Sequence, residues 1–155
     1  MNIEVIPTSN SVAEIELIYK PLMKISALPK VLHSKDAYRL LIESWDKTKL
    51  EFVEQFRVML LNRASRVLGI CTISTGGVAY TIADPKLIFA VALKANACRI
   101  ILAHNHPAGN LFPSKDDCAL TNRIKEGGKL LEICVEDHMI VSPEGYYSFA
   151  DEGAL

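Results

Sequence analysis

The sequence predicts an α/β fold in which a mixed β-sheet is flanked by helices. Short apolar runs of strand length alternate along the chain with longer segments whose apolar residues recur at helical spacing. Strands and helices interleaved in this way are typical of a sheet with helices packed against it. With 155 residues, 50% of them hydrophobic, the chain can bury one well-packed core but not two substantial ones.

Residues 1–49 are expected to form an N-terminal helical extension packed on the core, ahead of a domain over residues 50–155. The extension starts with a strand-like run (IEVI, residues 3–6) and a helical fragment over residues 14–19. A stronger helix begins near Asp36, with Ser34 as its expected N-cap. Its apolar residues recur at helical spacing: Ala37, Leu40, Leu41 and Trp45.

The next elements follow from alternation and turn signals. Residues 56–61 and 67–73 predict two strands joined by a hairpin, because the segment between them is polar. Asp84-Pro85 opens a helix (PKLIFAVALKANA) that leads into a buried strand over residues 99–103.

The last third of the chain predicts a helix and two strands. The helix starts at Ser114, with Ala119, Leu120 and Ile124 as its buried stripe, and Gly127-Gly128 is a natural C-cap. Strands over residues 132–141 and 146–150 flank the turn-forming S-P-E-G.

The segment HNHPAGNLFPSKDD, residues 104–117, predicts a metal site. Alternate side chains share one face of a strand, so His104 and His106 point the same way at the end of the apolar run 99–103. Pro107 and the A-G-N that follows direct the chain out of the sheet. Ser114 then resembles a helix N-cap, which places Asp117 in the first helical turn, facing the strand end.

Two neutral imidazoles and one carboxylate form a three-ligand set of the kind that leaves the fourth zinc position open in catalytic sites. Ser114 and Asp117 alone would indicate only a helix cap. The two histidines upstream favour a metal, because an unpaired polar cluster at the end of an apolar strand is costly. Asn105 is expected to face away from the pair. The neighbouring Asp116 is expected to be solvated, although a one-residue shift of the acidic ligand stays open.

These residues resemble the JAMM/MPN metallohydrolases, and in detail their RadC-like branch. The motif H-N-H-P-x-G-x-x-x-P-S is present from His104 to Ser114, and E-x-F-x-V-x-x-L-N is present from Glu54 to Asn62. The S-T-G of residues 74–76 and the Asp137-His138 pair also match. The resemblance covers about residues 50–150 and implies the JAMM/MPN, cytidine-deaminase-like architecture.

The resemblance implies a role for each matched residue. His104, His106 and Asp117 take the Zn²⁺-ligand positions, Glu54 takes the position of the general acid/base, and Ser114 takes the position that helps to stabilise an oxyanion. Without the match, Glu54 would be an ordinary solvated glutamate, and Glu51 is the alternative base.

One position departs from the family pattern. Members carry Pro-Ser-Gly after the second histidine, whereas this chain has Pro107-Ala108-Gly109 and so lacks one hydroxyl in the loop. Leu111 and Phe112, in the same loop, either line a substrate groove or turn into the core.

Global properties fit a cytoplasmic enzyme domain. The N-terminus lacks the basic and apolar regions of a signal peptide, and the longest apolar run, LIFAVAL, is far too short to span a membrane. The four cysteines lie far apart without C-x-x-C and are expected to be reduced core thiols. His33 is expected at the surface and His138 in the core or in a supporting position.

Other metal and nuclease motifs are excluded by spacing. An HNH nuclease disperses its residues over a ββα unit, a zinc deaminase needs H-x-E with P-C-x-x-C, and a zincin needs H-E-x-x-H. A DNA-repair role is traditional for the RadC-like branch, but its helix-hairpin-helix module needs glycines and none precedes Gly69.

Direct nucleic-acid binding is therefore disfavoured, and a net charge of −1 agrees. A local patch of lysines stays open: Lys20, Lys24, Lys30 and Lys35. We expect a zinc-dependent hydrolase of peptide or isopeptide bonds, acting on peptide or protein substrates, with homo-oligomerisation left open. The alternative is a non-catalytic metal-binding accessory protein in DNA repair or processing, which would share the ligands without needing the base.

Overall fold

A mixed five-stranded sheet forms the centre of the protein. The computed structural model describes residues 5–7, 13–15, 22–77 and 82–155. The sheet has the strand order β4-β3-β5-β6-β7. Its strands are β3 (Gln55–Leu61), β4 (Val67–Thr75), β5 (Arg99–Asn105), β6 (Cys134–Ser142) and β7 (Gly145–Ser148). The helices in the described part are α1 (Ser34–Ser44), α2 (Lys47–Leu50), α3 (Pro85–Lys94) and α4 (Lys115–Leu130), with a 3₁₀ turn at Ile25–Ala27.

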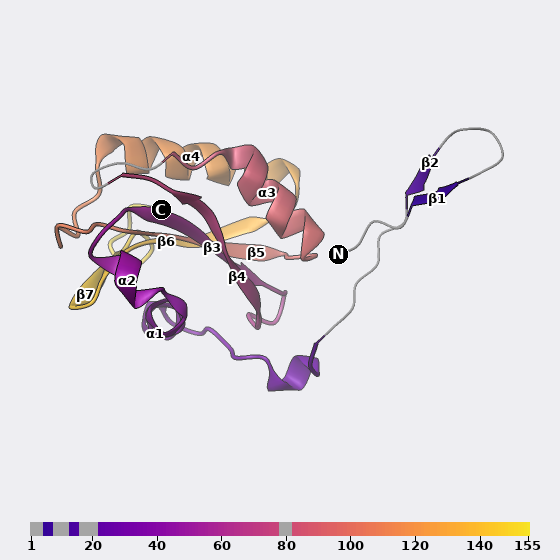
Figure 1. Cartoon of the computed structure of the whole chain (residues 1–155), viewed down its shortest axis with the longest axis horizontal. Coiled ribbons are helices and arrows are strands. Elements are labelled where there is room, and N and C mark those ends of the chain that lie inside the picture. The colour runs from indigo at the N-terminus through magenta and orange to yellow at the C-terminus, as the bar shows by residue number, and fades with distance from the viewer. Residues whose placement is uncertain (1–4, 8–12, 16–21, 78–81) are drawn as a thin grey trace.

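Two helical layers cover the two faces of this sheet (Figure 1). Helices α3 and α4 lie over one face and α1 and α2 over the other. Alternate strand residues serve the two cores: Val58 and Leu102 pack on the α3/α4 side, whereas Met59 and Ala103 pack on the α1 side. The predicted α/β class with a mixed sheet is confirmed.

The strand pairing explains why the sheet is mixed. Strands β5 and β6 are parallel, and the chain crosses between them through α4. All other neighbouring strands of the sheet are antiparallel, including the predicted β3–β4 hairpin. The C-terminal end of β5 therefore lies beside the start of α4, which is where ligands bind in sheets with parallel crossovers.

The N-terminal part differs from the expectation. Residues 13–15 form a short strand, β2 (Ala13–Ile15), paired antiparallel with β1 (Val5–Pro7). The helix expected over residues 14–19 is therefore wrong at its start, and residues 16–21 lie outside the described residues. The strand expected at 3–6 is present from Val5 onward. The proposed division at residue 49 stays a prediction, although α1 buries Ala37 and Leu41 in the core.

Helix α1 begins one residue earlier than predicted. Its N-cap is His33, not Ser34, because the Asp36 carboxylate accepts hydrogen bonds from the backbone N–H groups of Leu32 and His33 at 3.0 and 3.1 Å. The Ser34 hydroxyl instead donates to Asp151. His33 is exposed, as expected.

The C-terminus of α4 also differs from the sequence-based expectation. Gly127 and Gly128 lie inside the helix, which continues to Leu130. A Cβ atom on Gly128 would lie 2.3 Å from the backbone oxygen of Ile133, and one on Gly127 would lie 2.7 Å from Cε2 of Phe89. The two glycines therefore allow close packing and do not end the helix. Ala119, expected in the buried stripe, is exposed, whereas Ile124 is fully buried.

The cysteines are free thiols, but only Cys71 packs against the core. Cys98, Cys118 and Cys134 are exposed and Cys71 is half-buried. Cys98 and Cys134 lie at or beside strand starts, and Cys118 lies on the outer side of α4, so their apolar neighbours in sequence do not enclose them. Among the described residues, no helix is both long and apolar enough to cross a membrane.

Candidate metal centre

Two histidines project from the end of strand β5 toward the α3/α4 side of the sheet. His104 pairs with Phe56 of β3 and is 1% exposed, and its ring lies parallel to the Phe56 ring with centroids 6.0 Å apart. His106 follows the strand end and is half-buried. Asn105 lies between them and points to the opposite face, as predicted, where its amide donates to the backbone oxygens of Leu50 and Val53.

Asp117 reaches the same point from the first turn of α4. Ser114 is the N-cap of this helix, as predicted, and its hydroxyl accepts from the backbone N–H of Asp117 at 3.1 Å. In return, Oδ2 of Asp117 accepts from the backbone N–H and the hydroxyl of Ser114, both at 2.7 Å. This reciprocal cap holds Oδ2 and leaves Oδ1 directed at His104.

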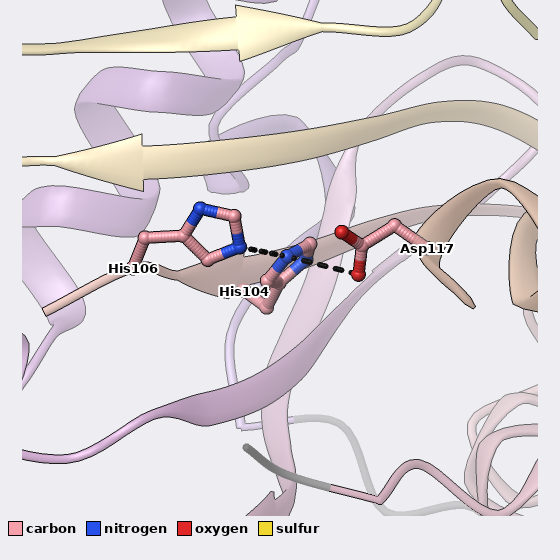
Figure 2. A group of neighbouring side chains, drawn as sticks. All are labelled: His104, His106 and Asp117. Atoms are coloured by element: carbon pink, nitrogen blue, oxygen red, sulfur yellow. Dashed lines mark hydrogen bonds and ion pairs between the residues drawn. The ribbon is translucent and has the colours of Figure 1, made fainter. Parts of the chain in front are cut away.

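Two of the three separations between the candidate ligand atoms are close to those around a tetrahedral metal (Figure 2). Nε2 of His104 lies 3.0 Å from Nε2 of His106 and 3.2 Å from Oδ1 of Asp117. Ligands at about 2.0–2.1 Å from a tetrahedral zinc are separated by roughly 3.3 Å. One ligand atom from each residue lies within 4.8 Å of the other two, so the group could hold a metal ion.

Proton positions support the same conclusion. Nδ1 of His106 contacts the backbone oxygen of Asn110, which can only accept, so a neutral His106 carries its proton on Nδ1. Its Nε2 lone pair then faces a carboxylate oxygen of Asp117 and Nε2 of His104. If Nε2 of His104 is bare as well, the electron pairs that converge here repel one another unless a cation lies between them.

Burial keeps His104 neutral. Desolvation lowers the pKa of His104 from 6.5 to about 4, the Asp117 carboxylate acts in the opposite direction, and His106 lowers it further. A neutral imidazole is the form that binds a metal.

Glu54 lies directly before β3, beside the two histidines. Its backbone pairs with Gly76 and Gly77, and its half-buried side chain lines the same cavity as His104, His106 and Asp117. Phe56 pairs with His104, so continuing this antiparallel register by two residues places Glu54 opposite His106, on the same face of the sheet.

The shared cavity has a volume of about 680 Å³. Polar groups from β5, α4 and the segment before β3 meet apolar side chains from Ile82 and the loop. Phe112 is 76% exposed and lines this cavity, whereas Leu111 is half-buried near Gly145. The sequence left open whether these two residues line a groove or turn into the core. Phe112 lines the cavity, whereas Leu111 does not.

The remaining candidates lie elsewhere or stay exposed. Glu51, the alternative base, is exposed and does not line the cavity. Asp116 is exposed, as expected, although it borders the cavity. Of the lysines considered for phosphate contacts, Lys20 lies outside the described residues and the other three are exposed: Lys24, Lys30 and Lys35.

Sequence reasoning expected His138 in the core or in a supporting position, which the structure confirms, but it missed Thr121. Thr121 lies one turn after Asp117 on α4, and its hydroxyl contacts Nδ1 of His138 at 2.6 Å. His138 is fully buried, and desolvation followed by the nearby histidines lowers its pKa well below the ordinary value. The spacing of Asp117 and Thr121 on one helix face is the only signal that could have pointed to Thr121.

Comparisons with a family model and with individual proteins identify the same family. A family model described as the RadC-like JAB domain matches residues 31–154. A UPF0758 protein of Flavobacterium johnsoniae is 39% identical over 129 residues, which cover 83% of this chain and 55% of that protein. UPF0758 proteins of Porphyromonas gingivalis and Thermosynechococcus vestitus are 44% and 45% identical over 66% and 63% of this chain, and 45% and 39% of those proteins. The chain thus spans about half the length of the curated relatives it matches.

Proposed function

Because the chain belongs to the RadC-like JAB domain family, we propose that it is a zinc-dependent hydrolase of amide bonds in peptides or isopeptide-linked proteins. One observation carries the proposal. A glutamate that could move a proton shares a cavity with two imidazoles and a carboxylate that could hold a metal.

The donor set favours zinc among the common metals. Two imidazole nitrogens and one carboxylate oxygen suit a borderline ion, whereas Mg²⁺ and Ca²⁺ prefer oxygen ligands throughout. When bound by three protein ligands, zinc keeps an open position, lowers the pKa of a bound water to about 7 and polarises a carbonyl group.

Glu54 is proposed as the general acid/base. Its carboxylate takes a proton from the attacking water and delivers it to the nitrogen of the leaving amine as the C–N bond breaks. The position opposite His106 suits this role, since the carboxylate enters the cavity from the strand next to β5.

Ser114 is proposed to stabilise the developing oxyanion, which requires its hydroxyl group to reorient. Its hydroxyl hydrogen is donated to Asp117, so it must turn away from that carboxylate to reach a substrate oxygen. In the arrangement described here, the same hydroxyl orients Asp117.

Substitution of Glu54 tests the proposal. The substrates are unstructured peptides and branched peptides joined through a lysine side chain, and the zinc content of each variant is measured beside the rate. Glu54→Gln should reduce hydrolysis by about 10²-fold or more while zinc stays bound. Glu51→Gln is the matched control, because Glu51 is exposed outside the cavity, and it should keep the wild-type rate.

Two results would contradict the proposal. Hydrolysis that is unchanged in zinc-loaded Glu54→Gln would exclude Glu54 as the base. A wild-type protein that binds zinc and cleaves neither kind of peptide would instead support a metal-binding accessory role, which needs the same three ligands and no base.

A further inference from the structure

A fully buried histidine lies directly behind the metal-facing ring of His104. His138 is on β6, the strand next to β5, and its ring lies between Phe149, at 4.8 Å between centroids, and Phe56, at 5.6 Å. Its two ring nitrogens contact His104 and Thr121. Neither contact involves a carboxylate, so a positive charge on the ring would have no counter-ion.

The hydroxyl of Thr121 determines which nitrogen of His138 carries the proton. This hydroxyl lies 2.6 Å from the backbone oxygen of Asp117 and 2.6 Å from Nδ1 of His138. The backbone oxygen can only accept, so the single hydroxyl hydrogen is donated to it. The contact with His138 is then a hydrogen bond only if Nδ1 of His138 carries the proton and donates to the hydroxyl oxygen.

The same reasoning continues to the metal ligand. A neutral His138 that is protonated on Nδ1 has a bare Nε2, which accepts a hydrogen bond from Nδ1–H of His104 at 2.9 Å. His104 then has its lone pair on Nε2, the atom that lies 3.0 Å from His106 and 3.2 Å from Asp117.

We propose that Thr121 and His138 are positioning residues which, through a chain of hydrogen bonds starting at the Asp117 backbone oxygen, hold His104 in the tautomer that presents Nε2 to a metal. This series of hydrogen bonds connects two of the three proposed ligands, because it begins at the backbone of Asp117 and ends at the buried imidazole of His104. Outer hydrogen bonds of this kind orient ligand histidines and typically alter metal affinity by 10–100-fold. The proposal rests on the metal-binding part of the proposed function and not on hydrolysis.

Long-range ¹H–¹⁵N NMR of protein labelled with ¹⁵N-histidine tests the proton positions directly. Nitrogens that carry hydrogen and bare nitrogens have distinct shifts, and His33→Gln, His106→Gln and His138→Gln variants assign the four rings. In the metal-free wild type, His104 and His138 should both carry the proton on Nδ1. Zinc should then shift Nε2 of His104 and leave the His138 pattern unchanged. A proton on Nε2 of either ring in the metal-free protein would overturn the proposal.

Two substitutions of Thr121 separate positioning from simple packing. Thr121→Val keeps the shape but removes the hydroxyl, so His138 is free to place its proton on either nitrogen. We expect mixed tautomers of His104 and a zinc affinity about 10-fold or more below that of the wild type, measured by competition with a chelator. Thr121→Ser keeps the hydroxyl and should restore both properties. A Thr121→Val protein with wild-type tautomers and wild-type zinc affinity would refute the proposal.

Failure of this proposal can be told apart from failure of the proposed function. If the tautomers and the effects of both Thr121 variants are as expected while no peptide is cleaved, the hydrolase is wrong and the positioning chain stands. If peptides are cleaved while metal-free His104 carries its proton on Nε2, the positioning chain is wrong and the hydrolase stands. Should Thr121→Val fail to fold, the wild-type NMR spectrum still decides.

Discussion

Replacing Gly128 by alanine tests the reason for the two glycines inside α4. The Cβ of Gly128→Ala would lie 2.3 Å from the backbone oxygen of Ile133, which is held by the chain entering β6. The Cβ of Gly127→Ala would lie 2.7 Å from Cε2 of Phe89, the outer edge of a half-buried side chain that can move. The two substitutions differ in what must shift, so they form a matched pair.

The expected magnitudes follow from this difference. An alanine in a helix interior gains about 1 kcal/mol over glycine in either variant. Forcing α4 away from the Ile133 backbone should cost about 3 kcal/mol, toward the upper end of overpacking effects, so Gly128→Ala should lose about 2 kcal/mol of stability. Movement of the Phe89 ring costs less, so Gly127→Ala should stay within about 1 kcal/mol of the wild type.

Urea unfolding and thermal melts measure both variants under identical metal content. A loss of about 2 kcal/mol should lower the Tm of Gly128→Ala by roughly 4–8 °C for a domain of this size. Gly128→Ala at least as stable as Gly127→Ala would refute the close-packing argument. It would then favour a helix end at these glycines, as the sequence alone indicates.

Three further predictions concern the site. Asn105→Ala should lose about 3 kcal/mol of stability in urea unfolding, because the buried Asn105 amide forms hydrogen bonds with three backbone groups before and at the start of β3. The same substitution should lower the rate of hydrolysis by displacing Glu54. Unchanged stability would contradict this prediction. Without metal, stability should fall as the pH drops below 6.5, since the unfolded chain protonates His104 near 6.5 and the folded chain only at about 4. The loss should reach about 3 kcal/mol at pH 4, and a flat profile of unfolding free energy in chelator between pH 6.5 and 5 would argue against it. Phe112→Ser should raise KM for peptides without changing stability, because this ring is 76% exposed and lines the cavity. An unchanged KM would show that Phe112 does not contact the substrate.

The candidate metal-binding group could be predicted from sequence because its geometry is local. His104 and His106 share a face through strand alternation, and Asp117 follows from the helix cap at Ser114. Glu54 could be placed only through the family resemblance, because its position opposite His106 depends on the pairing of β3 with β5, which no local pattern specifies.

Strand alternation alone could not predict which face of the sheet His138 occupies, for a specific structural reason. The register between β5 and β6 shifts after Ile100, so that Ile100 pairs with Val135 but Ile101 pairs with Asp137. Glu136 is the extra residue. Without this irregularity His138 would face the α1 side of the sheet, since a one-residue shift moves a side chain to the opposite face.

Sequence composition also could not tell a glycine that ends a helix from one that allows close packing, or an exposed cysteine from a buried one. Gly127-Gly128 has the pattern of a helix end, and only the approach of Ile133 and Phe89 shows that the pair lies within the helix. Cys118 is followed in sequence by the apolar Ala119 and Leu120, yet it lies on the exposed side of α4.

The zinc-to-protein ratio of purified wild type, His106→Ala and His33→Ala tests the central claim most directly. His33 is an exposed histidine on α1's N-terminal side, so its variant controls for unspecific binding. We predict one zinc per chain in the wild type and in His33→Ala, and strong loss in His106→Ala. Equal zinc in all three proteins, or none in the wild type, would contradict the assignment of His104, His106 and Asp117 as a metal site.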